Sequence, residues 1–210
     1  MSTPTPVPIS DHPDAPAWLR RADTSGALIT VEQGRVTWHD GHWLAGHWHG
    51  GTWCGGTWCG GDWHDGVWHA GHWLAGHWHG GTWRGGTWCG GDWRDGDWLD
   101  GDWRGGVWRA GDWFYGTWRE GTWCGGRWFG GRWCGGVWHA GVWHGGIWCA
   151  GHWFGGTWYR GYWRSGVWRG GYWCGGVWYD GTWHDGVWRG GDWCGGVWRG
   201  GTWHGDKASD

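Results

Sequence analysis

The residues best suited to chemistry in this chain of 210 residues are cysteine and histidine, and most of them occupy one position of a repeat. Eight of the 15 histidines directly follow a tryptophan within residues 41–205, and all eight cysteines do so. Neutral imidazole and thiolate are good ligands for Zn²⁺ and copper. What these side chains can do together depends on the elements that position them. The cysteines are Cys54, Cys59, Cys89, Cys124, Cys134, Cys149, Cys174 and Cys194.

The element that positions them is a five-residue repeat centred on tryptophan. Of the 35 tryptophans, 34 lie in one register that runs from Trp38 to Trp203. Residues 41–205 hold 33 copies of the unit G-x-W-x-x, and glycine stands two places before tryptophan in every copy. A fixed internal period of this kind predicts a repeat architecture rather than an ordinary globular core.

The columns of the repeat divide into an inside and an outside. The positions immediately before and after tryptophan vary and accept arginine and aspartate, so they must face water. The tryptophan column does not vary, and 34 exposed indoles would aggregate, so the indoles must form the interior. Each buried indole N–H then needs an acceptor, and we expect a backbone carbonyl at a nearby corner to supply it.

A period of five fits neither a helix nor a continuous strand, but it fits one side of a polygonal coil. Thr, Val or Ile precedes tryptophan in 18 of the 33 copies, which favours a short extended side. The small residues between sides tolerate the tight dihedral angles of a corner. Stacked coils would be joined by parallel backbone ladders about 4.8 Å apart.

Two coil sizes remain open: four units per coil, which we prefer, and three units. Four units per coil would give about eight coils in the array. Residues 41–65 and 71–95 are near copies that differ at two positions, and the second copy begins six units after the first. That offset is one and a half coils of four units, so it would place copied side chains on opposite faces. A coil of three units avoids this conflict.

The repeat resembles the pentapeptide-repeat family, whose consensus is A-D/N-L-x-x. In that family the large central residue and the small residue two places before it both point inward, and here tryptophan and glycine take those positions. The chain departs from the family in having no Leu or Phe in the central column of the array. The resemblance implies an all-β fold, a right-handed parallel β-solenoid with quadrilateral coils. It also implies a rod without catalytic activity.

The segments outside the array are expected to cap or extend it. Residues 1–25 form a proline-rich segment with a short helix, which begins at an N-cap Asp14 and covers the N-terminal end of the core. Residues 26–40 alternate in strand fashion around Gln33-Gly34, either as lead-in strands or as a first imperfect coil with Leu28 in the tryptophan register.

Residues 206–210 form a tail that is too short to cap the array, which spans residues 41–205. Solenoids need terminal caps because an open end exposes core surface. We therefore expect an end-to-end dimer through the uncapped C-terminal coil.

In a coil of four units, side chains four units apart would stack and form outward ladders. Such ladders of imidazole and thiol groups predict sites for zinc or copper. Cys174 and Cys194 would also be neighbours. The plainer interpretation is that this column accepts polar residues of medium size and that the ladders arise by chance. The predicted metal ligands are His49, His69 and Cys89 in one ladder and His39, Cys59 and His79 in the other.

Charge and composition narrow the classes of function. The array carries 12 arginines and 12 acidic residues, and a neutral body argues against nucleic-acid binding and against the DNA mimicry of the family's gyrase-binding members. No apolar run approaches the roughly 20 residues that span a bilayer. The N-terminus, MSTPTPVPIS, lacks the features of a secretory signal, so we expect a soluble cytoplasmic protein with reduced cysteines.

No catalytic arrangement emerges, so we expect no enzyme. The favoured function is a structural or protein-interaction rod whose partner is unknown. The alternative is a metal-binding or thiol-buffering protein that uses the outward ladders. A third hypothesis is that the recurring Trp-Cys dipeptides are the substrate of a modifying enzyme.

Overall fold

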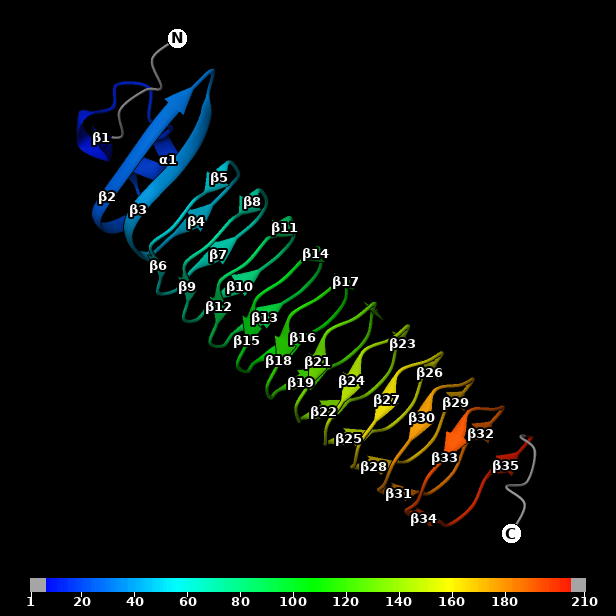
Figure 1. Cartoon of the computed structure of the whole chain (residues 1–210). Helices are drawn as coiled ribbons and strands as arrows, with labels where there is room; N and C mark the ends of the chain where they lie inside the picture. Colours follow the sequence, from blue (N-terminus) through cyan, green and yellow to red (C-terminus); the bar gives the residue numbers. More distant parts are fainter. Residues whose placement is uncertain (1–6, 205–210) are drawn as a thin grey trace.

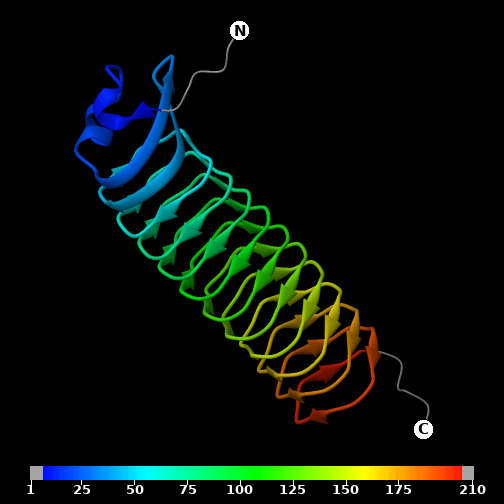
Figure 2. The same cartoon turned by 60° about the vertical axis from the view of Figure 1, so that its left-hand side comes forward.

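The computed structural model describes residues 7–204, which form a long rod with a small cap at its N-terminal end (Figure 1). Apart from the cap, the rod is a parallel β-solenoid in which each repeat after the first contributes one strand of two residues. Figure 2 shows the turns stacked at regular intervals along the rod. Residues 1–6 of the proline-rich segment and the predicted tail 206–210 lie outside the described residues.

Each turn of the solenoid consists of three repeat units and has three sides. Trp83 pairs in parallel with Trp68 below it and with Trp98 above it, and the same offset joins the other strands of the array. Eleven strands stack along one face, so the solenoid has eleven turns. The predicted all-β parallel solenoid is confirmed. The predicted four-sided coil and the count of about eight coils are wrong, and the three-unit alternative is the one that forms.

We name the three faces in the order in which the chain reaches them: the first at Trp38, the second at Trp43 and the third at Trp48. Strand β3 (Arg35–Ala45) begins both the first and the second face. The first face continues through β5 (Thr52–Trp53), β8 (Val67–Trp68), β11 (Thr82–Trp83), β14 (Asp97–Trp98), β17 (Asp112–Trp113), β20 (Arg127–Trp128), β23 (Val142–Trp143), β26 (Thr157–Trp158), β29 (Tyr172–Trp173), β32 (Val187–Trp188) and β35 (Thr202–Trp203).

The second and third faces are built in the same way. The second face continues through β6 (Thr57–Trp58), β9 (His72–Trp73), β12 (Thr87–Trp88), β15 (Asp102–Trp103), β18 (Thr117–Trp118), β21 (Arg132–Trp133), β24 (Ile147–Trp148), β27 (Tyr162–Trp163), β30 (Val177–Trp178) and β33 (Asp192–Trp193). The third face consists of β4 (His47–Trp48), β7 (Asp62–Trp63), β10 (His77–Trp78), β13 (Asp92–Trp93), β16 (Val107–Trp108), β19 (Thr122–Trp123), β22 (Val137–Trp138), β25 (His152–Trp153), β28 (Val167–Trp168), β31 (Thr182–Trp183) and β34 (Val197–Trp198).

The interior is a continuous stack of indoles, all fully buried from Trp38 to Trp188. Each ring stacks on the rings of the same face in the neighbouring turns, as Trp118 does on Trp103 with centroids 4.7 Å apart and planes 7° apart. It also meets the rings of the two adjacent sides edge to face, as Trp118 meets Trp123 at 5.9 Å and 74°. Aromatic pairs favour these geometries. Because glycine adds no side chain to the interior, one indole per side must fill it, and a fourth side would leave a void.

The glycine two places before each tryptophan lies at a corner whose backbone demands glycine. At Gly101 φ is +129°, and an added Cβ would lie 2.6 Å from the carbonyl oxygen of Gly86 in the preceding turn. The nearest indole atom, Nε1 of Trp83, would be 3.3 Å away. The close approach of stacked backbones and the positive φ therefore require glycine here more strongly than the space needed by the indole does.

The indole N–H groups meet the expected corner carbonyls at only a few positions. Trp138 and Trp153 each donate to the carbonyl of a glycine in the following turn at 3.2 Å, and Trp158 does so at 3.1 Å. The other 28 fully buried indole N–H groups have no hydrogen-bond partner among the described residues. The predicted carbonyl acceptor is therefore wrong for most of the array, because ring stacking rather than hydrogen bonding sets the orientation of the indoles.

The lead-in segment is an antiparallel hairpin of β2 (Asp23–Glu32) and β3, with its turn at Gln33-Gly34. Both turn residues have positive φ, +50° and +78°, as a two-residue hairpin turn requires. The alternating residues thus form paired strands. The interpretation of this segment as a first imperfect coil is wrong, because Leu28 is exposed while its neighbour Ile29 is fully buried.

The N-terminal cap covers the first turn of the core. Helix α1 is Ala17–Arg20, and its N-cap is Pro16 rather than the predicted Asp14. Trp18 of this helix packs edge-on against Trp48 at 5.2 Å, so the predicted covering of the N-terminal end is confirmed. No helix in the described part of the chain has the length and apolar character needed to cross a bilayer. The cap also contains β1 (Val7–Pro8), antiparallel to β2, and the 3-10 helix η1 (Ile9–Asp11).

Candidate functional site

The three-sided coil separates the residues of both predicted metal ladders. An offset of four units corresponds to one full turn plus one side, so each ladder is spread over all three faces. The same offset separates Cys174 from Cys194. These ladders are therefore wrong, and the metal sites built on them are withdrawn. His39 and His69 lie on the first face, Cys59 and Cys89 on the second, and His49 and His79 on the third.

The internal near copy agrees with the three-sided coil. The offset of six units between 41–65 and 71–95 is two full turns, so each copied side chain returns to its own face. His49 and His79, for example, occupy the same column of the third face, two turns apart. The duplication in the sequence was a signal for the three-unit turn.

On the third face, the turn of three units brings five histidines close to one aspartate. The Asp62 carboxylate lies 3.0 Å from Nδ1 of His47 and 2.9 Å from Nδ1 of His77. The ring of His64 stacks between those of His49 and His79, with centroids 5.0 and 4.8 Å apart. We call this group the histidine cluster: His47, His49, Asp62, His64, His77 and His79.

The histidine cluster shifts the titration of two of its members. Burial, followed by the charges of His79 and His49, lowers the pKa of His64 below its ordinary value. Burial acts to raise the pKa of Asp62, but the hydrogen bond from His77 and the neighbouring histidine charges outweigh it and lower that pKa. Protonation of His64, at the centre of the cluster, is therefore less favourable than protonation of a free imidazole.

The histidine cluster does not present a ready-made metal site. The rings of His49, His64 and His79 stack face to face, whereas those of His77 and His79 meet edge to face. Among residues 7–204, no group of three or more His, Cys, Asp or Glu side chains is arranged to hold a metal ion.

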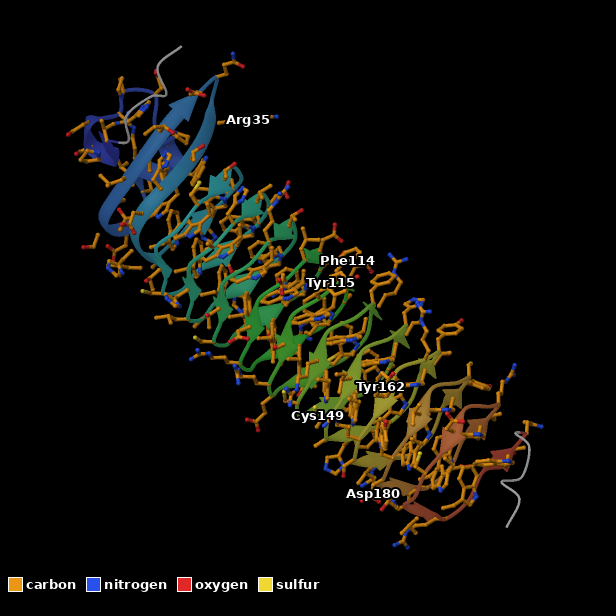
Figure 3. All side chains as sticks on the ribbon, in the orientation of Figure 1. Arg35, Phe114, Tyr115, Cys149, Tyr162 and Asp180 are labelled. Carbon is orange, nitrogen blue, oxygen red and sulfur yellow. The ribbon has the colours of Figure 1, made fainter. Side chains whose placement is uncertain are left out.

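Phenylalanine and tyrosine are concentrated in the C-terminal half of the rod, where they occur on all three faces. All three Phe and all five Tyr of the chain lie between residues 114 and 179. Six of the eight are exposed, and Tyr115 has 64% of its surface accessible. Figure 3 shows Phe114 and Tyr115 along the same edge of the rod. With the arginines interspersed among them, we call residues 113–179 the aromatic–arginine band.

Part of this band is an ordered ladder on the first face. The rings of Phe114 and Phe129 stack 5.0 Å apart, and His144 continues the stack at 4.8 Å. Tyr159 follows His144 at 5.4 Å. The guanidinium of Arg127 lies 5.6 Å from the centre of the Phe129 ring, within cation–π range.

The corner between the first and second faces is hollowed within the band. A shallow hollow of about 370 Å³ is lined by Ile147, Arg160, Tyr162, Val177 and corner glycines. Glycine produces the hollow because these corner positions carry no side chain. Arginine, aromatic and aliphatic groups therefore surround a depression on an otherwise regular surface.

The charges of the array are segregated along the rod, although they cancel overall. Residues 41–112 contain eight aspartates and four arginines, a net charge of −4. Residues 113–179 contain six arginines and one glutamate, a net charge of +5. The neutral total therefore hides a cationic segment that coincides with the aromatic–arginine band.

The cysteines are free thiols, and each is exposed or half-buried. Cys134 and Cys149 occupy successive turns of one column on the second face, and no other two cysteines of the sequence are separated by exactly three units. A coil of four units does not predict this pair, because it makes neighbours of side chains that are four units apart. The net charge of the whole array does not reveal the aromatic–arginine band, because 12 arginines and 12 acidic residues cancel.

Comparison with known proteins assigns the chain to no family. No protein-family model matches it. Comparison with curated proteins finds no match either.

Proposed function

We propose that this chain is a non-catalytic interaction rod of the pentapeptide-repeat type that binds an acidic protein partner in the cytoplasm through the aromatic–arginine band. The observation that carries the proposal is the confinement of every Phe and Tyr, with six arginines, to residues 113–179. A rod that served only as a spacer would need no such concentration on its surface.

The composition of the band favours a protein-binding surface. Tyr, Phe and Arg are enriched at protein interfaces, where they supply large contact areas. The solenoid backbone holds them at fixed positions, so little ordering is needed when a partner binds. The hollow beside Arg160 and Tyr162 can receive a protruding side chain.

The charge of the band supports an acidic partner. Residues 113–179 carry a net charge of +5, and Arg160 and Arg164 are exposed without an acidic partner among the described residues. A complementary potential steers encounter and selects among partners. Arg164 lies beside Tyr179, so a carboxylate bound there would meet an aromatic ring as well as a guanidinium.

Binding of a labelled polyglutamate peptide, measured by fluorescence anisotropy at low and at physiological salt, tests this proposal. Wild-type protein should bind the peptide, and Arg164→Glu should weaken binding about tenfold, roughly the effect of 1.4 kcal/mol. The matched control is Arg84→Glu, an exposed arginine of the acidic half. Equal binding by the two variants would overturn the assignment of the surface.

Duplex DNA of similar length serves as a competitor in the same assay. Arginine and aromatic side chains also contact nucleic acids, but there a phosphate backbone sets the affinity. We expect the DNA to compete poorly. The cationic segment adjoins aspartate-rich turns, and these turns would repel the phosphates of a duplex that extends beyond the segment. Tighter binding of DNA than of polyglutamate would replace the protein partner with a nucleic acid.

End-to-end pairing of two copies remains a separate prediction. Trp193 and Trp198 in the last turn are only partly buried, whereas the indoles from Trp38 to Trp188 are fully buried. Stacking two last turns against each other would cover this surface. Sedimentation velocity should show a dimer that Trp198→Arg dissociates, and a monomer at all concentrations would contradict the prediction.

The alternative hypothesis of metal binding is no longer supported, because the ladders on which it rested do not form. Thiol buffering retains the eight free cysteines as its support.

A further inference from the structure

Cys134 and Cys149 lie one above the other in adjacent turns of the second face. The tryptophans that precede them, Trp133 and Trp148, pair in parallel and stack with centroids 4.8 Å apart. The backbone N–H of Cys149 donates to the carbonyl of Trp133 at 2.7 Å. The Cα atoms of the two cysteines are therefore about one strand spacing apart, roughly 4.8 Å. Disulfides join Cα atoms that are roughly 4.4–6.8 Å apart.

An arginine lies against both thiols. Nε of Arg132 donates a hydrogen bond to Sγ of Cys149 at 3.3 Å. This bond, with the charges of Cys149 and Cys134, raises the pKa of the guanidinium. A guanidinium beside a sulfur favours the thiolate, which is the reactive form.

The two sulfurs have different surroundings. Burial, followed by the negative charge of a Cys149 thiolate, raises the pKa of Cys134, and Arg132 offsets this only in part. Both side chains are half-buried rather than enclosed, so a small reagent can reach them. Figure 3 shows Cys149 on the outside of the ribbon.

We propose that Cys134 and Cys149 form a thiol–disulfide site that small-molecule disulfides oxidise to a bond across adjacent turns, with Arg132 positioning and activating Cys149. The site lies outside the aromatic ladder but within the aromatic–arginine band, on the second face. The thiol exchange itself needs no bound protein partner. Its co-reactant is a low-molecular-weight disulfide such as oxidised glutathione.

The reaction proceeds by two exchanges. The Cys149 thiolate attacks one sulfur of oxidised glutathione, whose S–S bond breaks and releases one glutathione thiolate. Cys134 then loses its proton and attacks Sγ of Cys149, which forms the protein disulfide and releases the second glutathione thiolate. The protein gives up two electrons and two protons, and oxidised glutathione takes them up and becomes two molecules of reduced glutathione.

The other cysteines of the column provide an internal comparison. Cys59 and Cys89 share the second face, but Leu74 occupies the turn between them. Their separation is two turns, roughly 9.6 Å, which exceeds the span of a disulfide. They can form mixed disulfides with glutathione but no bond to each other within this fold.

Mass spectrometry of the whole chain after incubation with oxidised glutathione tests the proposal. After blocking with N-ethylmaleimide, trypsin should release residues 133–160, which contain only Cys134 and Cys149. We expect this peptide to be two hydrogens lighter and unlabelled, while Cys59 and Cys89 remain labelled or carry glutathione. Cys134→Ser should trap glutathione on Cys149, and Cys149→Ser should prevent the bond.

The role of Arg132 is tested separately by the pH profile. Arg132→Gln should slow disulfide formation about tenfold at pH 7 and much less at pH 9, where thiolate forms without help, and Arg132→Lys should restore most of the rate. Identical profiles for wild type and Arg132→Gln would remove Arg132 from the proposal. A 133–160 peptide that stays fully labelled while other thiols react, or bonds that form equally between other cysteines, would overturn the site itself.

Discussion

Gly101 lies directly above the carbonyl oxygen of Gly86, so closely that a Cβ on Gly101 would be 2.6 Å from that oxygen. This contact joins two successive turns and recurs with other glycines along the rod. Turn spacing, set by the backbone ladder, leaves no room for a side chain at this corner. The glycine column is therefore a requirement of the stacking.

The first prediction concerns this column. Gly101→Val should destabilise the protein by at least the 1–3 kcal/mol typical of overpacking, roughly several degrees in Tm, because it combines the backbone clash with a φ of +129°. Val107→Ala, on a half-buried outward position, should cost less. Thermal unfolding followed by circular dichroism compares the two. Similar Tm losses would mean that the corner can relax.

The second prediction concerns the indole stack. Trp118→Ala removes a ring that four others contact and should cost about 3–5 kcal/mol, on the order of 10 °C in Tm. Trp198→Ala in the last turn, where the indole is partly exposed, should cost much less. The wild-type protein should also show blue-shifted tryptophan emission. Emission resembling free indole in water would contradict the buried stack.

The third prediction concerns pH. His64 has a lowered pKa in the folded protein, so the unfolded chain binds its proton more readily. Stability should therefore fall as pH drops through about 6.5, the ordinary value for histidine, towards the folded pKa. Asp62, whose pKa is also lowered, adds a further loss as pH falls below about 3.8, its ordinary value.

His64→Gln should remove the loss near pH 6.5. Tm measured from pH 8 to pH 5 in wild type and variant gives the comparison. His152→Gln, an exposed residue of the same face outside the histidine cluster, is the control and should keep the wild-type profile. Parallel profiles for wild type and His64→Gln would show that the cluster does not titrate as described.

The fourth prediction concerns zinc. Because His69 stands on a different face from both His49 and Cys89, His69→Ala should change the effect of Zn²⁺ on Tm no more than His152→Ala does. Ligand binding raises Tm only through a site present in the folded state. A selective loss of the zinc response in His69→Ala would restore the ladder of the larger coil and contradict the three-unit turn.

The sequence by itself determined the nature of the repeat. The invariant column from Trp38 to Trp188 is the interior, and the variable columns beside it face water, because only that arrangement buries the indoles and leaves the charged residues hydrated. Parallel stacking followed from the same period. The hairpin around Gln33-Gly34 could also be predicted, since the strand-like alternation of residues 26–40 and the two turn residues both indicate a hairpin.

Only the tertiary structure decided how many sides close a turn. A period of five is compatible with three or four sides. The internal duplication favours three without excluding four, because the choice depends on how indoles pack around the axis. Rings such as Trp118 and Trp123 meet edge to face at 5.9 Å, and three of them fill the cross-section. Outward neighbours depend on that number, so the sequence could not place His49 beside His64, or Cys134 beside Cys149, until the turn was known.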